Sequence, residues 1–271
     1  MQRIGAAASV ISAFHNHSEL WIILKQNVDL FKQYIESTAT DHVALGVSGY
    51  SNLQMIKTHC NRLILNILTA FRAFIDHSET YLKQKYGRNS QIFRDWQKLV
   101  SDKATDNLSF AFLSNLRNYV QHCGMPVGHI GFESRLDNET ESISYVAEFN
   151  FDRDDLLARY RGWQPAVLTA LRKRPALFPI QPELETTMQC IAQIALSQMA
   201  LELPTVKPAV STLTTLVSEI TDPNARPCIL TQSLEGDGNP RMTFAHLPLE
   251  ALSYISRFIS DYEMGVLSRA F

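Results

Sequence analysis

The chain lacks the cysteine pattern of a disulfide-bonded or zinc-binding protein. Its four cysteines are scattered over 271 residues and form no Cys-x-x-Cys pair. This spacing favours a reducing compartment. The apolar run near the N-terminus is too short for a membrane span, and His15, His17 and Glu19 follow it at once, which is unlike a signal peptide. We therefore expect a cytoplasmic protein with no membrane partner.

Sequence motifs for nucleotide binding and for serine hydrolysis are also absent. The chain has no P-loop, no G-x-G-x-x-G and no G-x-S-x-G. No group of histidine, cysteine or aspartate has metal-ligand spacing, so we predict neither a metal ion nor a cofactor. Charged residues make up 19% of the chain and the net charge is -2, which excludes a protein whose whole surface binds nucleic acid. Any contact with RNA must use a local patch.

Apolar periodicity predicts a mainly helical fold. Hydrophobic residues make up 45% of the chain, enough for a substantial core. Helical spacing predicts these main helices: Ser18–Ser37, Asn52–Tyr86, Ser90–Leu99, Asp106–His122, Glu183–Glu202, Ala209–Ile220 and Leu249–Met264. Alternating apolar and polar residues predict two β-hairpins, one near residues 129–151 and one over Cys228–Ala245. Together these elements predict a helical bundle with two small β-hairpin insertions.

Proline positions mark the expected domain boundary. Pro175, Pro179 and Pro182 form one cluster of helix breakers, and Pro204 and Pro208 form another. Either cluster could mark a boundary, and neither has the length or composition of a flexible linker. We place the boundary at the second cluster. The chain then divides into a helical domain over residues 1–204 and an α+β accessory region over residues 205–271.

The segment Asp106–Pro126 predicts one amphipathic helix with a chemically distinctive polar side. Apolar residues at helical spacing form its buried stripe: Leu108, Phe112, Leu116, Tyr119 and Val120. At about 100° per residue, Arg117, Asn118 and His122 fall on the opposite side. Asp106 is the expected N-cap.

Arg117, Asn118 and His122 suit metal-free RNA cleavage. A histidine can move protons near neutral pH, and an arginine can bind a phosphate with its guanidinium fork. The alternative interpretation is a solvated or hydrogen-bonded helix end in a bundle. The same Arg-x4-His spacing also occurs at Arg72–His77, where a simpler interpretation is an ion pair of Arg72 with Asp76 beside a solvated His77.

The densest basic stretch of the chain is a second candidate for RNA contact. It includes Lys83, Lys85, Arg88 and Arg94, with Tyr86 among them. Basic and aromatic side chains together are what a surface that tracks single-stranded RNA uses. The alternative, which the intermixed acidic residues favour, is a solvated corner between two helices.

The stretch L-R-N-Y-V-Q-H at residues 116–122 resembles the HEPN superfamily of nucleases. That superfamily carries the motif R-x4-6-H, commonly with a polar residue directly after the arginine. Arg117, Asn118 and His122 match this motif, and the resemblance extends over Ser51–Val127. It implies a helical domain that acts as a metal-independent endoribonuclease.

The resemblance also implies roles for individual residues and partners. His122 would act as general acid or base, Arg117 would bind the phosphate, and Asn118 would orient His122 or the phosphate by hydrogen bonding. Asp76 or Glu79 could add a polar group from a neighbouring helix. Two motifs would face each other across a homodimer, and an antitoxin or sensor partner would control a toxin or phage-defence effector. Some members of the superfamily are not catalytic, so the alternative is a helical module that binds RNA, a nucleotide or a partner protein.

Overall fold

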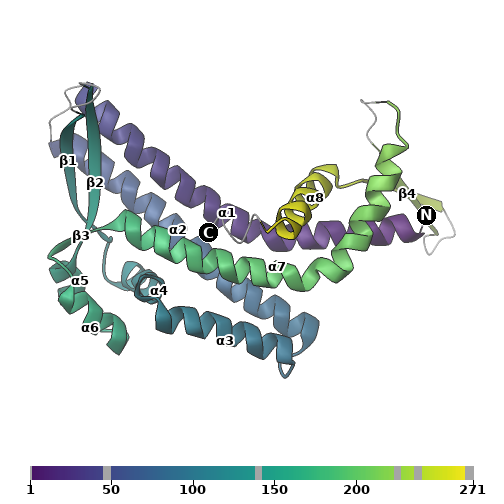
Figure 1. Ribbon diagram of the computed structural model, residues 1–271, viewed down its shortest axis with the longest axis horizontal. Coiled ribbons are helices and arrows are strands. Elements are labelled where there is room, and N and C mark those ends of the chain that lie inside the picture. Colours follow the sequence, from purple (N-terminus) through teal and green to yellow (C-terminus); the bar gives the residue numbers. More distant parts are fainter. Residues whose placement is uncertain (1, 45–49, 138–141, 223–226, 235–239, 266–271) are drawn as a thin grey trace. The chain divides into compact units, whose positions relative to one another are not determined.

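The computed structural model describes residues 2–44, 50–137, 142–222, 227–234 and 240–265 (Figure 1). Within these residues the helices are α1 (Gln2–Ala44), α2 (Tyr50–Tyr86), α3 (Gln91–Asp106), α4 (Leu108–His122), α5 (Arg153–Arg159), α6 (Pro165–Lys173), α7 (Ile180–Ser218) and α8 (Leu249–Glu263). The strands are β1 (Val127–Asp137), β2 (Ser142–Asp152), β3 (Leu177–Pro179), β4 (Cys228–Leu234) and β5 (Pro240–His246). The predicted fold class, mainly α with small β insertions, is confirmed.

The chain forms two compact units. The motif unit is Leu20–Ile194, and the terminal unit is Met1–Glu19 together with Ala195–Phe271. Helices α1 and α7 each contribute residues to both units. The boundary expected after residue 204 falls inside α7.

A three-stranded antiparallel sheet lies in the motif unit. Strands β1 and β2 form the predicted hairpin, which pairs Val127 with Phe151. Strand β3 adds to β2 and pairs Phe178 with Phe151, although the prolines around it predicted only a break in structure. The rings of these two residues lie 5.2 Å apart and both are buried, so apolar packing gives this proline-rich segment a strand conformation.

An aromatic cluster joins α4 to the sheet and to the segment before α6. The ring of Phe112 lies 5.2 Å from that of Phe151, 5.8 Å from that of Trp163 and 5.8 Å from that of Phe178. Each of these side chains is at most 5% exposed. This packing sets the rotation of α4 about its own axis and therefore decides which of its residues face solvent.

Two buried amide side chains anchor the segments that lead into α6 and β1. On α4, the Oδ1 atom of Asn115 accepts a hydrogen bond from the backbone N–H of Gln164 at 3.1 Å, and its Nδ2 atom donates to the carbonyl of Ala111 at 2.9 Å. On α2, the Oδ1 atom of Asn61 accepts from the N–H of Val127 at 3.1 Å. These bonds satisfy backbone donors where the chain enters α6 and β1.

In the terminal unit, α1 begins far earlier than the predicted start at Ser18. Buried Ala7, Ile11 and Phe14 continue its apolar face toward the N-terminus. Ser18 is therefore not an N-cap, and its hydroxyl donates to the carbonyl of His15 at 2.8 Å inside the helix. The ring of Phe14 packs 5.9 Å from that of Phe258 on α8, a contact between residues far apart in the sequence.

The predicted break at Pro204 and Pro208 is also wrong, because α7 continues through both prolines. Both are exposed and one helical turn apart, so both rings lie on the solvent side. Leu203, Val206 and Leu213 are at most 7% exposed on the opposite side. Burial of these side chains outweighs the lost backbone hydrogen bonds.

The second predicted hairpin is confirmed. Strands β4 and β5 pair antiparallel, with Leu230 opposite Phe244.

Replacing Asn115 with alanine tests the amide contact between α4 and α6. We expect Asn115→Ala to lower the free energy of unfolding by about 1–3 kcal/mol, because it leaves the N–H of Gln164 without its partner. Asn118→Ala, the same change at an exposed position of α4, should cost no more than about 0.5 kcal/mol. Urea unfolding followed by circular dichroism measures both, and equal losses would contradict the assigned role of Asn115.

Candidate functional site

Helix α4 carries the candidate site. It begins at an N-cap formed by Asn107, whose Oδ1 atom accepts from the N–H of Phe110 at 2.9 Å. The expected cap, Asp106, is instead the last residue of α3, because that helix runs on past its predicted end. At the other end the N–H of Cys123 donates to the carbonyl of Tyr119 at 2.8 Å. Four residues separate this end from the first residue of β1.

The outer side of α4 presents Arg117, Asn118 and His122. Asn118 and His122 are exposed and Arg117 is half-buried. The Nη1 atom of Arg117 donates to the Oδ1 atom of Asn118 at 3.4 Å, a long hydrogen bond between neighbours on the surface. The structure thus links Asn118 to the guanidinium. In the part of the chain that it describes, it records no bond between Asn118 and His122.

The inner side of α4 ends in a polar contact that the sequence analysis missed. Tyr119 is fully buried, and its phenol donates to the Oδ2 atom of Asp155 at 3.1 Å. The Oδ1 atom of Asp155 pairs with the Nε atom of Arg159 at 2.5 Å. Burial, and then the neighbouring carboxylate, raise the pKa of Tyr119 to about 12. In the sequence, the i, i+4 spacing of Asp155 and Arg159 indicates their ion pair, but it does not indicate the contact with Tyr119.

The second Arg-x4-His spacing, Arg72–His77, lies near the start of α4, whereas His122 lies at its end. On α2, the ring of Phe71 packs 5.2 Å from that of Phe110 in the first turn of α4, while Asn61 binds Val127 just beyond its last turn. The two helices are therefore antiparallel. From Phe71 onward α2 therefore runs toward and beyond the start of α4, away from its His122 end. This part of α2 holds all four secondary candidates: Arg72, Asp76, His77 and Glu79.

These secondary candidates make local contacts. Arg72 pairs with Asp76 at 2.8 Å and Glu79 pairs with Lys83 at 2.6 Å, whereas His77 is exposed. The structure thus contains the Arg72–Asp76 ion pair, which is the simpler interpretation of this spacing. It does not bring these residues to Arg117 and His122.

Most charges of the basic stretch between α2 and α3 are also engaged locally. Besides its ion pair, Lys83 lies over the ring of Phe93, 5.5 Å from the centroid. Lys85 donates to the hydroxyl of Tyr81 at 2.9 Å, and Arg94 donates to the carbonyl of Asn89 at 2.6 Å. Arg88 is exposed. RNA binding by this corner stays a prediction.

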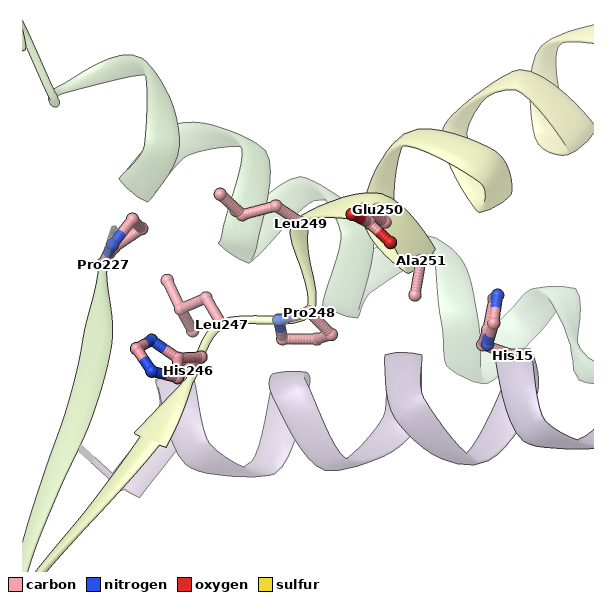
Figure 2. A pocket seen from close by; sticks show the side chains of 8 residues that line it. All are labelled: His15, Pro227, His246, Leu247, Pro248, Leu249, Glu250 and Ala251. Atoms are coloured by element: carbon pink, nitrogen blue, oxygen red, sulfur yellow. The ribbon is translucent and has the colours of Figure 1, made fainter. Parts of the chain in front are cut away.

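The terminal unit contains a cavity of about 570 Å³ that holds none of the predicted site residues. Its lining is His15, Pro227, His246, Leu247, Pro248, Leu249, Glu250 and Ala251. Figure 2 shows His15 on α1 and His246 at the end of β5, with the remaining side chains where β4 begins and where β5 leads into α8. The volume suits a small ligand. Its polar side chains are the imidazoles of His15 and His246 and the carboxylate of Glu250.

Two kinds of feature are absent from the residues that the structure describes. Within these ranges, no three His, Cys, Asp or Glu side chains gather where they could hold a metal ion. None of the helices in these residues has both the length and the apolar character of a transmembrane span. Comparison with protein-family models, with curated proteins and with solved structures finds no match to this chain.

The raised pKa of Tyr119 predicts a loss of stability at high pH. The neutral phenol is favoured in the folded state, so its contribution is complete below about pH 10, the usual tyrosine pKa. It is lost as the pH rises through the folded-state pKa of about 12. At neutral pH, Tyr119→Phe should lower the free energy of unfolding by about 1–3 kcal/mol.

Urea unfolding of wild type and Tyr119→Phe between neutral pH and about pH 11 measures the difference in stability. The difference should shrink above about pH 10, while the other tyrosines cancel because both proteins contain them. A difference that stays constant over this range would contradict the assignment.

Proposed function

We propose that this chain is a metal-independent endoribonuclease in which His122 and Arg117 carry the reaction. The observation that carries the proposal is the placement of both side chains, with Asn118, on the outer side of one helix. The other side of that helix is fixed by buried Phe112, Leu116 and Tyr119, so the helix cannot turn its polar side inward without losing its core.

The proposed reaction uses RNA as its own nucleophile. His122 accepts the proton of a ribose 2′-hydroxyl, and the 2′-oxygen forms a bond to the adjacent phosphorus. The bond from phosphorus to the 5′-oxygen breaks, and its electron pair leaves with that oxygen, which takes up a proton from an acid. The products are a 2′,3′-cyclic phosphate and a 5′-hydroxyl. Arg117 binds the phosphate and stabilises the charge of the pentavalent transition state.

A dimer would supply the acid that one histidine alone cannot provide. Two copies related by a two-fold axis through the exposed side of α4 would place two arginines and two histidines around one phosphate. One His122 would then act as base and the other as acid. Such an enzyme fits a toxin or defence effector under the control of an antitoxin or sensor partner, because uncontrolled RNA cleavage harms the cell.

The alternative is a helical module that binds RNA, a nucleotide or a partner protein without catalysis. One observation favours it. Catalytic histidines are commonly oriented by a third group, yet among the described residues the structure records no hydrogen bond or ion pair to His122. The same side of α4 would then bind a phosphate through Arg117 without moving a proton.

RNA cleavage in the presence of EDTA separates these two functions. We expect wild-type protein to cut single-stranded RNA and His122→Ala to be slower by about 10²–10⁴-fold, the usual contribution of a general acid or base. Arg117→Ala should be comparably impaired through loss of phosphate binding. Gln121→Ala, at an exposed position next to His122, is the matched control and should retain wild-type activity.

End-group analysis of the products completes this test. Cyclic phosphates made by wild type and by Gln121→Ala would support attack by the 2′-hydroxyl. If folded wild-type protein binds RNA but leaves it intact, the binding module is the correct function. Activity that disappears with EDTA would contradict both readings of this site.

A further inference from the structure

The guanidinium of Arg159 lies beside the end of α4. Asp155 holds it through the 2.5 Å ion pair and is itself bound by the phenol of Tyr119. A Cβ atom added to Gly124 would lie 3.3 Å from the Nη1 atom of Arg159, so the guanidinium lies close to Gly124. Gly124 follows His122 by only two positions. The Arg159 side chain is 56% exposed, so it is positioned by the protein yet still open to solvent.

Arg161 projects outward from the same turn of chain. Tyr160 has an extended backbone, with φ -126° and ψ 127°, and its ring packs 6.3 Å from that of Tyr119 and 5.1 Å from that of Trp163. Side chains alternate in direction along extended backbone, so Arg161 faces away from these rings and is exposed. A Cβ atom at Gly162 would lie 2.5 Å from the hydroxyl of Tyr160, which shows how tightly this turn is folded.

The surrounding sequence is strongly basic. Between Arg153 and Arg174 the chain has six basic residues and two acidic ones, although the whole protein carries a net charge of -2. Within the described ranges, the structure records no acidic partner for Arg161 or Arg117. By contrast, Lys83 in the corner between α2 and α3 has a carboxylate partner. Arg159 and Arg161 therefore add positive charge near the C-terminal end of α4, although Arg159 shares its charge with Asp155.

Arg159 also stabilises the fold in two ways. A cation at the C-terminal end of α4 complements the helix dipole, and an i, i+4 ion pair stabilises α5. Neither effect explains the exposed and unpaired Arg161. Both effects would also leave RNA affinity and its dependence on salt unchanged, which gives the test its readout.

We infer that Arg159 and Arg161 bind the phosphates of a single-stranded RNA that passes the Arg117–His122 side of α4. This inference rests on the proposed function, because it describes how the RNA substrate of that site is held. Arg159 binds next to the reacting phosphate, and Arg161 binds the strand further along. The Tyr119–Asp155 contact fixes the position of Arg159 and so acts as a support for the RNA surface.

The test measures binding of a fluorescent single-stranded RNA to full-length His122→Ala, whose cleavage is blocked, over a range of salt concentrations. Adding Arg159→Gln and Arg161→Gln should weaken binding roughly tenfold or more. It should also lower the slope of log affinity against log salt by about 1.4, since each phosphate contact to a single strand contributes about 0.7. The pair Arg159→Lys and Arg161→Lys should retain most of that slope.

A matched control carries Arg3→Gln and Arg257→Gln, an exposed pair in the terminal unit with the same change in net charge. This pair should leave RNA affinity unchanged. Thermal unfolding of each variant separates a loss of folding from a loss of binding. If the Arg159 and Arg161 glutamine pair is folded and binds RNA with wild-type affinity and slope, the inference is overturned. Failure of His122→Ala itself to bind RNA would overturn it equally.

Cleavage by wild-type protein judges the proposed function separately. If wild type cuts RNA and the glutamine pair does not change RNA affinity, the proposed RNA surface is wrong and the proposed nuclease function is retained. Wild type that does not cut, combined with RNA binding that depends on Arg159 and Arg161, removes the nuclease and supports the surface.

Discussion

Burial of the inner side of α4 is the constraint on which the rest of the motif unit depends. Phe112 packs against the sheet and against Trp163, and Tyr119 reaches Asp155 on α5. One helix of 15 residues thus contacts the sheet, α2, α3 and α6. Its rotation is therefore set by the core, and the positions left facing solvent include Asn118 and His122. The candidate site therefore lies on the side of α4 that core packing leaves exposed to solvent.

The two sides of α4 differ in how firmly their polar groups are held. On the inner side, a buried phenol, a carboxylate and a guanidinium form a continuous chain through Asp155. On the outer side, Arg117 makes one long hydrogen bond to its neighbour Asn118. Catalysis requires groups that are held in place. A site on the outer side therefore depends on what binds there, whether RNA or a second copy of the chain.

Local patterns predicted the elements whose signal is local. The hairpin of β1 and β2 follows from alternating residues, and the end of α2 follows from Gly87, which has a φ of 89° that suits glycine. Predictions failed where distant contacts decide. Prolines at 204 and 208 sit in a helix because the opposite side is buried, and β3 forms because Phe178 packs on Phe151.

The sequence by itself determined that α4 is amphipathic and that Arg117, Asn118 and His122 share its polar side, because helical periodicity depends only on spacing. Tertiary structure decided which other residues accompany them. The antiparallel packing of α2 on α4 places Arg72 and His77 toward the start of α4, at the opposite end from His122. The fold of α5 brings Arg159 close to Gly124, although they are 35 positions apart along the chain. Such contacts depend on how side chains pack in three dimensions, which spacing along the chain does not specify.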